Sequence, residues 1–104
     1  MSEWVKIGET GAWAPEPGQV KVIMPRDDRI ALCNVDGQLY AIDDVCTHDG
    51  GSLDQGDLLG DKIECPRHGA LFDVRTGKAL TLPAIFPIRT YPVKIDGSDI
   101  LIEL

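Results

Sequence analysis

Two Asp-Gly pairs, at residues 36–37 and 96–97, each separate two runs rich in apolar and β-branched residues. An Asp-Gly pair between two such runs is the strongest short-range signal for a β-hairpin, because its residues tolerate the positive φ angles of a tight turn. The sequence therefore predicts two antiparallel hairpins. The four runs occupy residues 29–35, 38–42, 91–95 and 99–104.

The rest of the chain also favours short strands. Residues 19–23 and 71–74 are two further strand candidates, and residues 75–78 favour a tight turn. No window of about 12 residues has a helical period free of Gly and Pro. Short strands with frequent turns predict an all-β fold, an antiparallel sandwich or barrel. Four apolar residues of the second hairpin recur at period two on one face, which we expect to be buried: Val93, Ile95, Ile100 and Ile102.

Size and charge narrow the possible functions. With 104 residues, the chain is expected to form a single domain, residues 1–104, and to be a monomer. The net charge of −7 argues against binding to nucleic acid or to an anionic membrane surface. The sequence has no apolar run of about 18 residues that could span a membrane. Because residues 1–6 lack the features of a secretory signal, we expect a cytoplasmic location.

Residues 43–70 are rich in Gly and hold both histidines and two of the three cysteines. Cys46 and His48 form one Cys-x-His arm, and Cys65 and His68 form a second, Cys-x-x-His arm. Chance is a poor explanation, since the only two histidines each lie within three residues of a cysteine. Two thiolates and two imidazoles suit zinc or an iron–sulfur cluster, and they exclude calcium and magnesium, which prefer oxygen ligands.

The order of the ligands separates these two possibilities in part. Zinc sites of the Cys2His2 type commonly place like ligands together on each arm, whereas each arm here mixes Cys with His. In Rieske centres, two His replace two Cys on one iron of a [2Fe–2S] cluster. Zinc stays open as the second interpretation.

The two arms resemble the Rieske [2Fe–2S] motif, together with Asp49-Gly50-Gly51 after the first arm and Phe72-Asp73 after the second. The chain length and flanking hairpins resemble the small ferredoxin component of bacterial ring-hydroxylating oxygenase systems. This resemblance implies an antiparallel β base that carries a smaller, loop-rich cluster-binding subdomain at about residues 43–78.

The resemblance also assigns roles to the four candidate ligands. Cys46 and Cys65 are expected to bind the buried iron, and His48 and His68 the outer iron. The two imidazole rings are then expected near the tip of the protein, where an exposed edge would serve as the electron exit.

Several positions depart from the Rieske proteins of respiratory complexes. Those proteins carry an extra, disulfide-bonded Cys in each loop, where this chain has Gly51 and Arg67. They also place Ser and Tyr after the second arm, where this chain has Ala70 and Phe72, neither of which can donate a hydrogen bond. The loss of these hydrogen-bond donors to the sulfurs lowers the reduction potential, so we expect roughly −150 mV rather than +300 mV. Cys33, the remaining cysteine, is expected to be a core residue.

The resemblance implies a one-electron carrier rather than an enzyme. Such a ferredoxin would accept electrons from an NAD(P)H-dependent flavoprotein reductase and pass them to a terminal oxygenase. Two alternatives remain open from the sequence: the small subunit of a nitrite-reductase-like enzyme, and a non-redox, zinc-binding interaction module.

Overall fold

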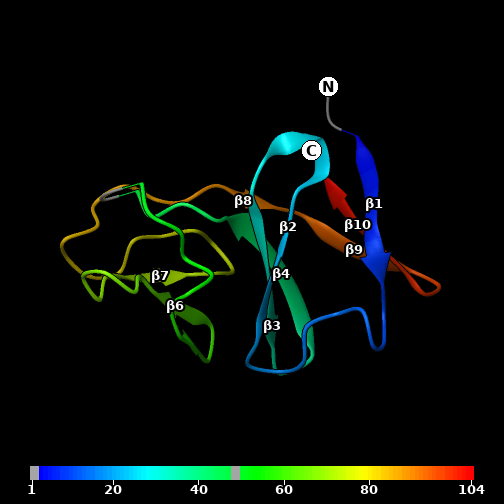
Figure 1. Ribbon diagram of the computed structural model, residues 1–104, viewed down its shortest axis with the longest axis horizontal. Helices are drawn as coiled ribbons and strands as arrows, with labels where there is room; N and C mark the ends of the chain where they lie inside the picture. Colours follow the sequence, from blue (N-terminus) through cyan, green and yellow to red (C-terminus); the bar gives the residue numbers. More distant parts are fainter. Residues whose placement is uncertain (1–2, 48–49) are drawn as a thin grey trace.

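The computed structural model describes residues 3–47 and 50–104, and it shows three antiparallel sheets side by side (Figure 1). The first sheet has the order β1-β10-β9, the second β2-β3-β4-β8 and the third β5-β6-β7. The second sheet lies between the other two in Figure 1. The strands are β1 (Trp4–Glu9), β2 (Val20–Ile23), β3 (Ile30–Val35), β4 (Gln38–Asp43), β5 (Leu58–Leu59), β6 (Lys62–Glu64), β7 (Leu71–Asp73), β8 (Thr90–Tyr91), β9 (Val93–Asp96) and β10 (Asp99–Glu103).

The all-β prediction is therefore confirmed. Within the described ranges, the only helical element is a 3-10 turn, η1 (Pro25–Asp27). No helix among these residues is long and apolar enough to cross a membrane.

Both predicted hairpins form, with different turns. In the first, Val35 pairs with Gln38, and Asp36 and Gly37 have φ of 51° and 94°, as a type I′ turn requires. In the second, Asp96 pairs with Asp99, so the loop lies at residues 97–98, one residue later than the Asp-Gly pair.

The expected strand at residues 91–95 is wrong as a single element. Tyr91 pairs with Ala41 in the second sheet, whereas Val93 pairs with Ile102 in the first. Pro92 stands between them and has no N–H to continue a ladder, so the chain changes sheets there. Ile95 is also half exposed rather than buried, because β9 is the edge strand of its sheet.

Two buried clusters lie on opposite faces of the central sheet, because successive side chains of a strand point to opposite sides. On β3, Ile30 and Leu32 pack with Ile102 of the first sheet. Ala31 and Cys33 pack on the other face, against a cluster that includes Ile63 of the third sheet. Cys33 is thus a core residue, as expected, and burial raises the pKa of its thiol to about 12.

Candidate metal centre

Two loops carry the candidate ligands, and the first follows β4. Its backbone closes on itself through two hydrogen bonds around Cys46. The Cys46 N–H donates to the Gly51 carbonyl at 2.7 Å, and the Gly50 N–H donates to the Cys46 carbonyl at 2.8 Å. Gly50 has a φ of 76°, which a residue with a side chain rarely adopts.

The second loop connects β6 to β7 and repeats this arrangement around Cys65. The Cys65 N–H donates to the Ala70 carbonyl at 2.7 Å, and the Gly69 N–H donates to the Cys65 carbonyl at 2.9 Å. Gly69 has a φ of 72°, close to that of Gly50. The two arms, which differ in Cys–His spacing, therefore share one backbone design with the cysteine at its start.

The structure brings the two cysteines into the same environment. Cys46 and Cys65 are both buried in one cluster with Leu53, Ile63 and Ala70. His68 is exposed on the second loop. His48, the fourth predicted ligand, lies outside the described residues. A pair of buried thiols with an exposed imidazole agrees with the expected division between an inner and an outer iron.

A glycine sets how closely the segment after the first loop approaches the base of the second arm. Gly56 follows the first loop, and a Cβ added to it would lie 1.7 Å from the Glu64 carbonyl oxygen and 3.2 Å from Pro66 Cδ. Glu64 and Pro66 flank Cys65 directly. The absence of a side chain at residue 56 therefore permits the contact between the segment that follows the first loop and the base of the second arm.

A buried carboxylate supports the first loop. The Asp44 side chain accepts hydrogen bonds from the backbone N–H groups of Leu53 and Asp54 and from the Arg29 guanidinium. Burial raises the pKa of the Asp44 carboxyl above its ordinary value, and the hydrogen bonds from Arg29, Asp54 and Leu53 offset part of that rise.

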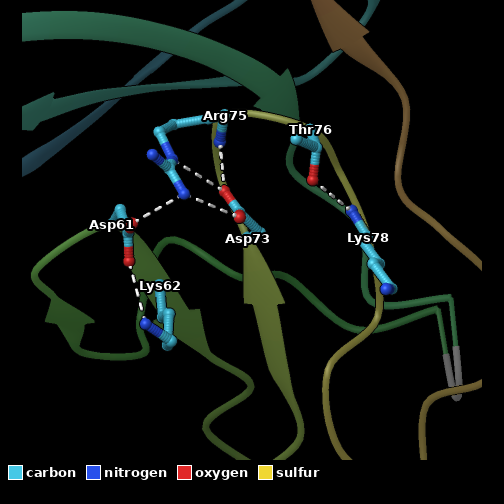
Figure 2. Close-up of polar contacts among 6 residues, drawn as sticks. All are labelled: Asp61, Lys62, Asp73, Arg75, Thr76 and Lys78. Carbon is cyan, nitrogen blue, oxygen red and sulfur yellow. Dashed lines mark hydrogen bonds and ion pairs between the residues drawn. The ribbon is translucent and has the colours of Figure 1, made fainter.

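Charged side chains support the sheet that carries the second loop (Figure 2). The Arg75 guanidinium lies 3.0 Å from Asp61 and 3.3 Å from Asp73, so it joins the turn before β6 to the end of β7. A hydrogen bond from Lys62 lowers the pKa of Asp61. Burial alone would raise the pKa of Asp73, but hydrogen bonds from the side chain and backbone of Arg75 bring it below its ordinary value.

The segment between Pro83 and Pro87 lies against the first loop, where the Thr47 hydroxyl donates to the Phe86 carbonyl at 2.7 Å. Its two largest side chains are mostly exposed: Ile85 is 71% and Phe86 64% exposed. The segment therefore adds an apolar surface beside the first loop.

The donor set fits a [2Fe–2S] cluster with mixed ligands, because the buried thiols and the exposed imidazole lie on two loops of matching backbone. Among residues 3–47 and 50–104, no group of three or more His, Cys, Asp or Glu side chains is arranged to hold a single metal ion. The fit of these residues to a [2Fe–2S] cluster therefore rests on the loop backbone and on the burial of the two cysteines.

Comparison with known proteins decides the family, since the Rieske [2Fe–2S] domain family matches residues 3–92. The chain belongs to this family. The Rieske fold and the [2Fe–2S] cofactor are thus confirmed, and a zinc module is set aside.

Two relatives place this Rieske domain more narrowly. The 3-phenylpropionate/cinnamic acid dioxygenase ferredoxin subunit of Shigella boydii serotype 4 (strain Sb227) is 54% identical over 76 residues, 72% of each chain. The biphenyl 2,3-dioxygenase ferredoxin component of Rhodococcus jostii (strain RHA1) is 42% identical over 99 residues, 95% of this chain and 91% of the relative. The Rieske domain therefore belongs with the electron-carrying ferredoxins of aromatic-ring dioxygenase systems.

A solved structure agrees with this placement. A chain in the complex of reduced oxygenase and oxidized ferredoxin in carbazole 1,9a-dioxygenase is 33% identical to this Rieske domain, with a TM-score of 0.86. The match covers 95% of this chain and 91% of that one.

Sequence reasoning missed the residues that support the loops. Asp44 is one of several acidic residues near the first arm, and its partner Arg29 lies 15 positions away. Gly56 was one of several glycines, and nothing local indicates its contact with Glu64. Strand β6 also lay within the segment predicted to be loop-rich.

Proposed function

We propose that this ferredoxin carries single electrons from an NAD(P)H-dependent flavoprotein reductase to the terminal oxygenase of an aromatic-ring dioxygenase system. The observation that best supports this role is the pair of matching loops, each built around a buried cysteine. The ferredoxin names of the two relatives support it over a nitrite-reductase small subunit. The carbazole dioxygenase complex of ferredoxin with oxygenase supports the oxygenase as the acceptor.

In this proposal Cys46, His48, Cys65 and His68 bind the cluster, within a subdomain of about residues 43–78. When bound, the cluster supplies one-electron chemistry. The two cysteines hold it from the protein interior, where the surrounding apolar side chains exclude water. The exposed imidazole of His68 places one ligand at the surface, within reach of a partner.

The buried surroundings support a potential at the low end of the Rieske range. Ala70 and Phe72 are fully buried after the second loop, and neither side chain can donate a hydrogen bond to sulfur. Donors to sulfur stabilise the extra negative charge of the reduced state, so their absence lowers the potential. A value near roughly −150 mV suits a carrier between a flavoprotein and an oxygenase.

The surface beside His68 supports docking at this end of the molecule. Arg67 is exposed next to His68, and the exposed Ile85 and Phe86 lie on the segment that contacts the first loop. Exposed apolar side chains together with polar groups are typical of a protein interface.

Visible and low-temperature EPR spectra of the anaerobically reconstituted protein, before and after dithionite, test the ligand assignment. We expect a rhombic Rieske-type signal on reduction. Cys46→Ser and Cys65→Ser should abolish it, whereas Cys33→Ser, at the third buried cysteine, should retain it. A normal spectrum in either of the first two variants would refute the ligand assignment.

Stopped-flow mixing with a reductase and an oxygenase of the biphenyl or phenylpropionate dioxygenase type tests the role itself. We expect Phe86→Ser to slow electron transfer to the oxygenase without changing the spectrum. Ile95→Ser serves as the control: Ile95 is an exposed apolar residue (49%, against 64% for Phe86) on β9 in the distant first sheet. Equal rates for both variants would remove the docking proposal.

The monomeric state and the cytoplasmic location stay predictions. Analytical ultracentrifugation of the cluster-loaded protein and fractionation of the source cells would check them.

A further inference from the structure

The two cluster loops share a backbone design but differ in how they are anchored. The second loop is the connection of a hairpin, with Glu64 paired to Leu71 directly on either side of it. The strand ladder therefore fixes both of its ends. The first loop begins where β4 ends at Asp43, and its far end, near residue 54, belongs to no strand. Something other than a ladder must hold its two ends together.

Asp44 stands at this point. Its Oδ1 accepts the Leu53 N–H at 2.9 Å and the Asp54 N–H at 2.7 Å. These bonds close a ring of backbone from residue 44 to residue 54 that contains Cys46. The Asp44 side chain is fully buried, so water cannot replace the lost partners if these bonds are broken.

Arg29 connects this ring to the central sheet. Its guanidinium donates to the other carboxylate oxygen, Oδ2, through Nε at 3.2 Å and Nη2 at 2.9 Å. Its carbonyl accepts the Asp44 N–H at 3.0 Å, directly beside the first residue pair of β3 and β4. Four hydrogen bonds therefore satisfy the carboxylate, two from the loop backbone and two from Arg29, the residue before β3.

We propose that Asp44 is the positioning residue of the first cluster loop, performing with one carboxylate what the strand ladder does for the second loop. This inference rests on the proposed cluster site at Cys46 and His48. The Asp44–Arg29 pair sets where the first arm stands relative to the rigid sheet. Metal ligands tolerate displacements of only about 0.2 Å, so an arm without this anchor would hold the cluster poorly.

Asp44→Asn in the full-length, cluster-reconstituted protein tests the proposal. Asn keeps the size and one acceptor oxygen, but it turns an amide N–H2 toward the Arg29 guanidinium, donor against donor. We expect less iron per chain, altered EPR g-values, and hydrogen exchange at residues 44–56 faster by about tenfold, as for the loss of a hydrogen bond to a charged group. Exchange at residues 62–73, which the ladder holds, should change little.

Asp54→Asn is the matched control for charge. Asp54 lies beside the same guanidinium, at 3.6 Å, but its side chain makes none of the bonds that close the ring. Asp54→Asn removes the same unit of charge as Asp44→Asn. A purely electrostatic role for Asp44 would therefore give the two variants similar spectra. We expect normal loading, g-values and exchange in this control. Arg29→Gln/Asp44→Asn, in which the Gln carbonyl can accept from the Asn amide, should recover part of the loading.

Each result decides the proposal. If Asp44→Asn matches the wild type in iron content, g-values and exchange, or if Asp54→Asn changes them equally, the proposal is overturned. If Asp44→Asn does not fold, Arg29→Gln takes its place, and unchanged exchange at residues 44–56 in that variant overturns the proposal. Failure of the wild type itself to load a cluster would instead refute the proposed function.

Discussion

The contact of Gly56 with Glu64, at the base of the second arm, gives the most direct prediction, because it leaves no room for a side chain at residue 56. Gly56→Ala would place a Cβ 1.7 Å from the Glu64 carbonyl oxygen, and contacts under 3.0 Å are essentially never seen. The two backbones must then separate by at least about 1.3 Å. Since metal ligands tolerate about 0.2 Å, such a shift in the arm that carries Cys65 should disrupt the cluster.

We expect Gly56→Ala to lower the free energy of unfolding by about 1–3 kcal/mol, as overpacking commonly does, and to reduce the iron bound per chain. Iron analysis, the EPR spectrum and the temperature at which the visible absorbance is lost would measure this. Gly97→Ala is the control: its Cβ meets nothing within 4 Å, and its φ of 64° confines the cost to backbone strain on the β9–β10 turn. It should lower stability without changing the iron content.

Gly56→Ala is compared directly with the wild type in three measurements: iron content, g-values and the temperature at which the visible absorbance is lost. Wild-type values in all three would show that the cluster site does not depend on this contact. Equal losses of iron in both variants would attribute the effect to general destabilisation instead. Either result would refute the reasoning.

Three further predictions concern the surroundings of the second loop and the core. Ala70→Ser should raise the reduction potential by about 40 mV, since a new donor worth about 1 kcal/mol stabilises the reduced state; a lower or unchanged potential in a redox titration contradicts this. Asp73 should titrate below its ordinary pKa of 3.8, so its contribution to stability is present above that pH and is lost as the pH falls through the lower, folded value. Carbon NMR titration should show this midpoint rising in Arg75→Gln. Leu53→Ala should cost about 2–5 kcal/mol in chemical unfolding, because the Leu53 side chain of the first loop is fully buried; a cost under 1 kcal/mol would refute its core role.

Local chemistry explains what the sequence could predict. The turn at Asp36 and Gly37 depends on φ angles that few residues adopt, so the first hairpin could be placed correctly. The Cys and His arms were visible because their spacing is short. Pro92 has an equally local effect, but its consequence, a change of sheet, depends on which strand lies nearby and could not be read from the run at residues 91–95.

The support of the site escaped prediction because it is made of contacts between distant residues. The bond from Arg29 to Asp44 and the contact of Gly56 with Glu64 join segments whose separation in sequence carries no periodic signal. Ile95 shows the same limit for burial, since its alternation with Val93 is correct but its strand lies at an edge.

The placement of β3 between two buried clusters has a consequence for the stability of the protein before it binds iron. Ala31 and Cys33 pack in the cluster that also contains Cys46, Cys65 and other residues from the half of the molecule that contains the cluster loops. If those loops open, one side of the central sheet meets water while Ile30 and Leu32 keep the other side folded. A newly made chain without the cluster would then be partly folded, with an exposed apolar face that favours aggregation and cleavage by proteases. The supply of iron and sulfide would thus set how much of the protein survives in the cell, as well as how much of it is active.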